Sequence, residues 1–413
     1  MDAVVARARL RRAPLGPARV FRYAARLLAA SILAPAAAVA QMTPPRAVTP
    51  ALRQLVRDSV DRVLERAIAD SAFPGAYAIV GTSNGILAER GVGRLDWAAD
   101  SPAPTAHTLW DLASLTKVVG MTSAVMQLVE QGRVSLDAPV QRYLPDWTGP
   151  GKQAVTIRHL LTHTAGLPAF KQYYKEATSP AEARRLFFAT PLDTTPGSRM
   201  VYSDIGAWLL GQVVERVSGQ SLDRYLDARV FAPLGMRETR YRPPASERSR
   251  IAPTEVDPWR GRKVHGEVHD ENAFALGGVS AHAGIFSSAH DLALLARAYL
   301  NEGQLDGARV FAPTTVRLFT MRADSGSSRA LGWDMATGRN SAGRRMSSRA
   351  FGHTGFTGTS FWVDPAHDVF VILLSNRVNP SRENTKIGGV RVALADAVMA
   401  ALGIAPSSSA SRP

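Results

Sequence analysis

The sequence predicts an α+β fold in which one antiparallel sheet is assembled from both ends of the chain. Strand signals lie near the N-terminus, at 76–80 and 86–88, and return only after residue 330. The stretch between them, from about 114 to 300, carries mainly helical periodicity interrupted by Pro- and Gly-rich loops. We therefore expect helices flanking the sheet and an inserted all-helical subdomain, with a cleft where the two subdomains meet.

The first 40 residues predict a cleaved export signal. Seven arginines precede an apolar stretch at 27–40, which ends in Ala38-Val39-Ala40 before Gln41. This small-x-small ending is the pattern that a signal peptidase accepts. A retained membrane anchor is the alternative, but the stretch has 14 residues whereas a span needs about 20. We expect a periplasmic or secreted protein that meets the membrane only during export.

Composition excludes several classes of function. The signal carries seven Arg and one Asp, so its removal lowers the formal net charge from +14 to +8. The remaining basic residues are scattered among acidic ones, which does not indicate a nucleic-acid partner. The chain has no cysteine, so core burial without disulfides must stabilise it. No nucleotide-binding fingerprint is present, and we expect no cofactor.

The elements of the mature chain follow from periodicity and turn signals. Apolar spacing predicts a helix over 50–71, and Asn84-Gly85 predicts a tight turn between the first two strands. Further helices are predicted at 114–131, 156–162, 180–189, 204–218, 221–229, 289–301 and 388–402. Further strands are predicted at 331–335, 359–363 and 369–374. The predicted organisation is a signal at 1–40, a domain at 41–403 and a disordered tail at 404–413. Within the domain, 50–110 and 325–403 would form the sheet subdomain and 111–324 the helical one.

Ser114 and Lys117 are the first candidate site residues. They lie three positions apart at the start of a predicted helix, where residues i and i+3 share a face. A serine hydroxyl needs a nearby base to act as a nucleophile, and an amine can serve. The structural alternative is a helix cap at Ser114 with Lys117 exposed to solvent.

Two later segments hold further candidates. Tyr202 and Asp204 precede the predicted helix 204–218, so the phenol could exchange a proton with Ser114, or Asp204 could simply cap the helix. His353-Thr354-Gly355 precedes a predicted strand pair, where backbone N–H groups could bind an extended substrate or an oxyanion. A turn without function is the alternative for that tripeptide.

The three motifs, Ser114-x-x-Lys117, Tyr202-x-Asp204 and His353-Thr354-Gly355, are separated by about 85 and 150 residues. In this order they resemble the penicillin-recognising serine hydrolases, which include class C-type β-lactamases, D,D-peptidases and related esterases. The segment 160–167 is also similar to that family. Two further stretches, 269–273 with 276–278 and 375–380, resemble the branch of penicillin-binding-protein-4B-like proteins and muramyl-peptide amidases. The resemblance implies a β-lactamase/transpeptidase-like fold.

The resemblance also implies roles for these residues. Ser114 would be the acylated nucleophile, Lys117 its activating base and Tyr202 a proton relay. The N–H groups of Ser114 and Phe356 would form the oxyanion hole. His353 stands where the family more often has lysine, and Asp204 where classical β-lactamases have asparagine. An acidic residue there would hold Lys117 charged and repel a substrate carboxylate, which argues against strong β-lactamase activity.

Other polar groups offer alternatives. His159 and His163 lie four apart on one helical face, and His265, His269, Asp270, Glu271 and His282 form a loop cluster, so either set could bind a metal. Neither matches a known ligand pattern, and no metal site is predicted. Arg377 could pair with a substrate carboxylate or lie on the surface.

The sequence therefore predicts an exported serine hydrolase that forms an acyl-enzyme on an amide or ester. The substrate would be a small molecule or a peptidoglycan fragment. Three alternatives stay open: a weak class C-type β-lactamase, a non-catalytic penicillin-binding or sensor module, and a metal-dependent hydrolase.

Overall fold

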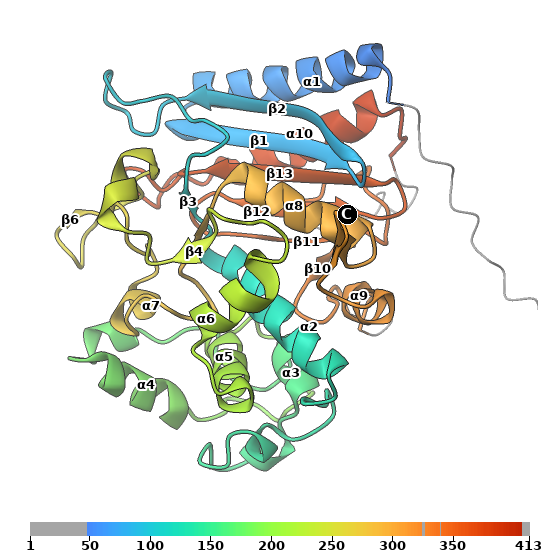
Figure 1. Ribbon diagram of the computed structural model, residues 1–413. Helices are drawn as coiled ribbons and strands as arrows, with labels where there is room; N and C mark the ends of the chain where they lie inside the picture. Colours follow the sequence, from blue (N-terminus) through green and yellow to red (C-terminus); the bar gives the residue numbers. More distant parts are fainter. Residues whose placement is uncertain (1–47, 324–326, 339, 407–413) are drawn as a thin grey trace, which may run out of the picture. The chain divides into compact units, whose positions relative to one another are not determined.

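The computed structural model describes residues 48–323, 327–338 and 340–406. The predicted export signal lies outside these residues, as does most of the predicted tail. The described residues form one compact unit, which is shown in Figure 1. In the part of the chain that the structure describes, no helix is both long enough and apolar enough to cross a membrane.

The central feature is a six-stranded sheet in the order β10-β11-β12-β13-β1-β2, with antiparallel pairing throughout. Its strands are β1 (Gly75–Thr82), β2 (Gly85–Gly93), β10 (Asp334–Met335), β11 (Phe351–Thr354), β12 (Ser360–Asp364) and β13 (Val369–Ser375). The N-terminal hairpin thus pairs with C-terminal strands, as the sequence predicts. The α+β fold class is confirmed.

Helices cover the sheet and fill the middle of the chain. The α-helices are α1 (Pro50–Ala69), α2 (Ser123–Glu130), α3 (Ile157–Leu161), α4 (Pro180–Ala189), α5 (Asp204–Ser218), α6 (Leu222–Leu226), α7 (Glu271–Ala275), α8 (Ala289–Leu300), α9 (Pro313–Thr320) and α10 (Ile387–Ala401). The short 3-10 helices are η1 (Ala113–Leu115), η3 (Val140–Arg142), η4 (Lys152–Ala154), η5 (Tyr173–Lys175) and η7 (Ala245–Arg250), while η2 (Lys117–Thr122) and η6 (Asp227–Phe231) are π-helical.

The two faces of the sheet belong to different cores, because successive strand residues point to opposite sides. Ile79 of β1 joins the larger core together with the helical middle of the chain. Its neighbours Ala78 and Val80 join a second core with α1 and α10. Figure 1 shows α1 and α10 on one side of the sheet and α8 on the other.

Small sheets complete the fold. The largest has the order β3-β7-β4 and consists of β3 (Trp110–Asp111), β7 (Ile285–Ser287) and β4 (Arg240–Tyr241). Two short hairpins are β5 (Val256–Asp257) with β6 (Arg262–Lys263), and β8 (Gln304–Leu305) with β9 (Ala308–Arg309). The sequence did not predict these strands. β3 matters most for the site, because it leads directly into the turn that carries Ser114.

Three predicted elements differ from the structure, and one is the helix predicted at 221–229, which is α6 followed by the π-helical η6. The strand predicted at 331–335 is shorter in the structure, where only β10 (Asp334–Met335) forms. Gly332 has a φ of +87°, which interrupts extended backbone, and a Cβ there would lie 2.2 Å from Thr122 Oγ1. The segment predicted as one helix over 114–131 is a succession of η1, η2 and α2. The widened π-helical turns begin at Lys117, and such turns are frequent at functional sites.

Candidate active site

Ser114 lies in a strained turn that follows β3. Asp111 Oδ1 accepts the N–H of Ala113 at 2.8 Å. Ala113 has a φ of +46°, in the left-handed region that residues with a side chain rarely adopt. Strain of this kind is concentrated at functional sites. The turn directs the chain into η1 and η2, which carry Ser114 and Lys117.

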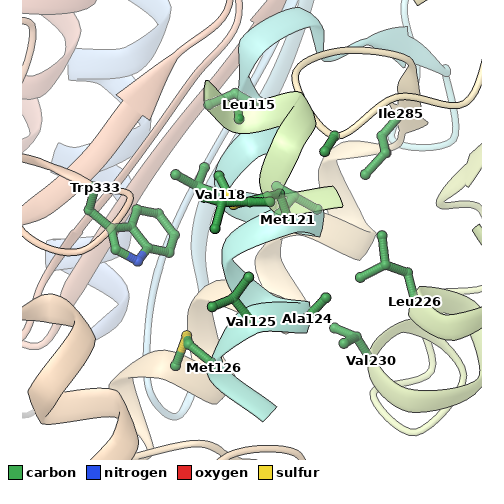
Figure 2. Close-up of a cluster of buried hydrophobic side chains, with 14 of the residues drawn as sticks. Leu115, Val118, Met121, Ala124, Val125, Met126, Leu226, Val230, Ile285 and Trp333 are labelled. Atoms are coloured by element: carbon green, nitrogen blue, oxygen red, sulfur yellow. The ribbon is translucent and has the colours of Figure 1, made fainter. Parts of the chain in front are cut away.

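The segment that carries these residues is anchored by its apolar side chains. In Figure 2, Val118 and Met126 lie on the side of Trp333. Met121 and Ala124 lie on the opposite side, where Ile285 is found. All of these side chains belong to the larger core. The backbone on which Ser114 stands is therefore held by core packing.

Lys117 is buried and fully engaged, so the alternative of a solvent-exposed lysine is wrong. Its side chain is 1% exposed. Nζ donates to Ser114 Oγ and to the His282 carbonyl, each at 3.0 Å, and pairs with Asp204 Oδ1 at 2.7 Å. Burial lowers the pKa of Lys117, but the charge of Asp204 outweighs burial and raises it above its usual value. Lys117 is therefore an ammonium group at neutral pH.

Asp204 does not cap α5; the cap is Ser203. Ser203 Oγ accepts the N–H of Gly206 at 3.1 Å and donates to the Pro168 carbonyl at 2.7 Å. Asp204 occupies the first turn of the helix, where a negative charge is favoured by the helix dipole. Its carboxylate is consequently available for the ion pair with Lys117.

Tyr202 lies between several basic groups. Lys117 Nζ is 4.9 Å and Arg329 Cζ 5.2 Å from its ring centroid, and the rings of His163 and His353 are at 4.7 and 5.7 Å. The Oη atom is buried and makes no well-aligned hydrogen bond among the described residues, although the side chains of Lys117 and Ser114 lie close enough to interact with it. Burial raises the pKa of Tyr202, against the opposing charge of Lys117. The phenol is therefore protonated at neutral pH and can donate its proton.

His353 lies inside β11, a strand that the sequence analysis did not predict. Its side chain is buried, and Nδ1 donates to the Thr354 carbonyl at 2.8 Å. Nε2 is buried without a hydrogen-bond partner in the described ranges. Burial lowers the pKa of His353 to about 4, and the charges of Arg329 and Lys117 act in the same direction. His353 is therefore a neutral acceptor and not the cation that a lysine would provide.

The turn after β11 is tied to the backbone just before Ser114. Thr357 Oγ1 donates to the Asp111 carbonyl at 2.7 Å, and Thr359 Oγ1 donates to the Leu112 carbonyl at 3.0 Å. Half-buried Thr354, at the end of β11, pairs with Ser360 of β12. A Cβ on Gly355 would lie 2.1 Å from Thr359 Oγ1 and 2.2 Å from the Leu112 carbonyl oxygen. Glycine is thus required for the two segments to meet.

Phe356 lies in this turn and is 48% exposed. Among the residues that the structure describes, no acceptor receives its N–H. The Phe356 carbonyl accepts from Arg377 Nε at 2.8 Å, and Arg377 Nη1 donates to the Arg382 and Asn384 carbonyls. Arg377 is buried, so it is not a surface arginine. Its pairing with a substrate carboxylate stays a prediction, while its contacts fix the turn.

The histidines considered as metal ligands have other partners. His159 Nδ1 accepts the N–H of Thr156, and His163 Nδ1 accepts the N–H of Ser203. In the loop, His282 Nε2 contacts Asp270 Oδ1 at 3.0 Å. Within 48–323, 327–338 and 340–406, no group of three or more His, Asp or Glu side chains is arranged to hold a metal ion. The geometry offers no support for metal-dependent hydrolysis.

The loop cluster instead forms ion pairs beside the site. His269 Nε2 contacts Glu255 Oε2 at 2.9 Å, and Arg382 pairs with both Glu255 and Glu271 at 2.7 Å. His269 also donates its backbone N–H to Asp111 Oδ2. The cluster therefore supports the turn that leads to Ser114.

Comparison with known proteins decides the family. The β-lactamase family model matches residues 60–395. The chain belongs to the β-lactamase family. A relative from Escherichia coli O157:H7, named "Putative D-alanyl-D-alanine carboxypeptidase", is 33% identical over 356 residues, which cover 78% of this chain and 82% of the relative. This β-lactamase-family protein is accordingly a serine hydrolase.

Solved structures confirm the fold of this family member. A penicillin-binding protein homologue from Caulobacter crescentus superposes with a TM-score of 0.70 at 23% identity, covering 86% of this chain and 98% of the other. The hydrolase EstCE1, described as having promiscuous acyltransferase activity, gives a TM-score of 0.69 at 23% identity, with coverage of 84% and 99%.

Proposed function

We propose that this protein cleaves an amide or ester of a peptidoglycan fragment through an acyl-enzyme on Ser114, as a D,D-peptidase, muramyl amidase or esterase. The observation that carries the proposal is the line of contacts from Ser114 Oγ to Lys117 Nζ at 3.0 Å and on to Asp204 Oδ1 at 2.7 Å. The name of the Escherichia coli relative favours a D-alanyl-D-alanine bond as the one cleaved.

Lys117 and Asp204 would act together as the base. Lys117 is charged at rest, so it can accept the Ser114 proton only if it passes one of its own protons to Asp204. Ser114 Oγ then bonds to the carbonyl carbon of the substrate, and the carbonyl becomes an oxyanion. The buried setting strengthens these electrostatic interactions relative to water.

Collapse of this intermediate needs an acid, and Tyr202 would supply it. The protonated phenol gives its proton to the leaving amine or alcohol, which departs as the carbonyl re-forms. The proton now held by Lys117 and Asp204 restores the phenol. Water would then attack the acyl group with the same residues acting in reverse, releasing the carboxylic acid and free Ser114.

The backbone N–H groups of Ser114 and Phe356 would bind the oxyanion. Two observations support this role: no acceptor among the described residues receives the Phe356 N–H, and two threonines hold its turn against the Ser114 segment. His353 and Thr354 would line the adjacent strand edge, where an extended peptide can bind.

Intact-mass detection of the acyl-enzyme tests the proposal. The protein is exposed to a panel of a penicillin, p-nitrophenyl esters and a pentapeptide muropeptide ending in D-alanyl-D-alanine. The wild type should gain the mass of the acyl group, and Ser114→Ala should not. Ser123→Ala is the matched control, because Ser123 begins α2, after the end of η2, and its buried hydroxyl donates to the Val118 carbonyl. An unchanged adduct on Ser114→Ala would refute the assignment.

The same panel separates the alternatives. Penicillin turnover that exceeds muropeptide turnover would identify a class C-type β-lactamase. A stable penicillin adduct without turnover of any substrate would identify a binding or sensor module. We also propose export to the periplasm or medium, which predicts a mature N-terminus at Gln41 by mass spectrometry.

A further inference from the structure

The peptide group that joins Gly355 and Phe356 has different surroundings at its two ends. Its N–H, which belongs to Phe356, meets no acceptor among the described residues. Its carbonyl, which belongs to Gly355, accepts from Arg391 Nη2 at 2.6 Å and from the Gly358 N–H at 3.1 Å. Among the described residues, the N–H of this amide therefore has no acceptor, while its carbonyl contacts a guanidinium.

Arg391 reaches this peptide from α10. The same Nη2 atom also donates to the Thr359 carbonyl at 2.8 Å, so it joins both ends of the turn. Within the described part of the chain, Arg377 is the one charged neighbour that affects the pKa of Arg391, no acidic group does so, and Arg391 Nε is buried without a hydrogen-bond partner. Burial lowers the pKa of Arg391 to about 10, and the nearby charge of Arg377 contributes. A cation without a counter-ion is costly to bury.

A positive charge at a carbonyl oxygen changes the N–H of the same amide. It draws electron density toward the oxygen, which makes the N–H more positive and a stronger donor. Hydrogen bonds in such chains strengthen one another by about 10–30% each. The gain is largest when the acceptor is an anion, because charge-assisted hydrogen bonds are about twice as strong as neutral ones.

We propose that Arg391 is a positioning residue that strengthens the Phe356 N–H as the oxyanion donor, acting through the Gly355 carbonyl. This inference rests on the proposed function. It assigns a role in catalysis to a side chain of the C-terminal helix that does not touch the substrate.

The carbonyls of two neighbouring peptides contact other groups. The Ser114 N–H belongs to the peptide whose carbonyl, that of Ala113, accepts the backbone N–H of Thr116. Arg377 donates to the Phe356 carbonyl, whose amide carries the N–H of Thr357. The peptide between Phe356 and Thr357 thus also has a guanidinium at its carbonyl, but the Phe356 N–H belongs to the peptide that contacts Arg391.

The test compares Arg391→Met, Arg391→Lys and wild type in steady-state hydrolysis of a p-nitrophenyl ester and in binding of phenylboronic acid. The boronic acid forms a tetrahedral adduct on the serine and so reports oxyanion binding. Losing a whole oxyanion donor costs about 10²–10³-fold in kcat, so losing only its polarisation should cost less. For Arg391→Met we expect kcat to fall about 10-fold with KM unchanged, and boronate affinity to weaken in parallel.

Arg391→Lys keeps the charge and should restore most of kcat and of boronate affinity. Lys386→Met is the matched control: it removes a cation at the start of the same helix, where Lys386 donates to the Asp70 carbonyl and not to the turn. It should leave kcat and boronate affinity unchanged. If Arg391→Met does not fold, as judged by thermal unfolding, Arg391→Gln replaces it and is expected to lose kcat relative to Arg391→Lys.

Unchanged kcat and boronate affinity in the folded Arg391→Met or Arg391→Gln variant would overturn the inference. So would a loss confined to KM, or equal losses in Arg391→Lys and Arg391→Met. Failure of the proposed function looks different: the wild type itself would then form no acyl-enzyme and bind no boronate.

Discussion

Replacing Asp204 by asparagine removes the charge that holds Lys117 protonated and leaves a side chain of the same size. The two charged atoms are 2.7 Å apart, which at an effective dielectric constant of about 20 corresponds to about 6 kcal/mol, or roughly 4 pKa units. Asp204 is 18% exposed, so screening reduces this effect. We expect the pKa of Lys117 to fall by about 2 to 4 units.

The pH dependence of kcat/KM should be nearly flat in the wild type and should rise with pH in Asp204→Asn. In the wild type, the Lys117–Asp204 pair can pass a proton internally, so kcat/KM for an ester should vary little between about pH 6 and 9. In Asp204→Asn, the neutral form of Lys117 must act alone. Because its population rises tenfold per pH unit below the pKa, kcat/KM should rise about tenfold per unit over part of that range.

The assay combines pH–rate profiles with ¹³C NMR of labelled lysine side chains. The chain has only six lysines, and the spectrum of Lys117→Met identifies the signal of Lys117. Asp204→Glu is the control that retains the charge and should retain a raised pKa. The reasoning is refuted if Lys117 titrates at the same pH in wild type and Asp204→Asn. It is also refuted if the wild-type profile already rises tenfold per unit.

Three further predictions concern the turn, the phenol and the ion pairs. Tyr202→Phe should lower kcat/KM for a peptide about 10²-fold with little change in the melting temperature, since the buried Oη makes no well-aligned hydrogen bond among the described residues. A clear loss of stability would contradict this. Gly355→Ala should destabilise the protein by about 3 kcal/mol or more and abolish ester hydrolysis, because the new Cβ would clash with Thr359 Oγ1 and the Leu112 carbonyl. Chemical denaturation and ester assays measure the two effects. An unchanged midpoint of denaturation would contradict the close approach at Gly355. Burial raises the pKa of Glu255, but hydrogen bonds from His269 and Arg382 outweigh burial and lower the pKa to about 2. The Glu255 carboxylate therefore contributes about 3 kcal/mol to the free energy of unfolding above about pH 4.5. This contribution is lost as the pH falls toward about 2. Glu255→Gln should flatten that acid dependence in urea unfolding, and an identical dependence in both proteins would exclude the ion pair as its source.

Local signals predicted the long elements well. The helices predicted at 180–189 and 204–218 coincide with α4 and α5. Ser179 caps the first, and Gly219, with a φ of +74°, ends the second. Such signals act within one turn of helix, so a sequence contains them in full.

Non-local contacts account for what the sequence analysis missed. β11 has four residues, and it forms because β12 pairs with it. Thr357, Thr359 and Arg391 act on backbone carbonyls, which every residue possesses. No pattern of residue types therefore marks these acceptors. The candidate site residues Ser114, Lys117 and Tyr202 could be found because their chemistry lies in the side chains themselves.

The hydrogen bonds from Thr357 and Thr359 to the Asp111 and Leu112 carbonyls determine when the active site can form during synthesis. They join residues that are 246 and 247 positions apart in the chain. A ribosome therefore releases Ser114, Lys117 and Tyr202 long before the segment that must fold onto them. Contacts of such high sequence separation form late, because closing a long loop is entropically costly. The nascent chain should thus carry an unreactive serine until nearly all of the polypeptide has been made.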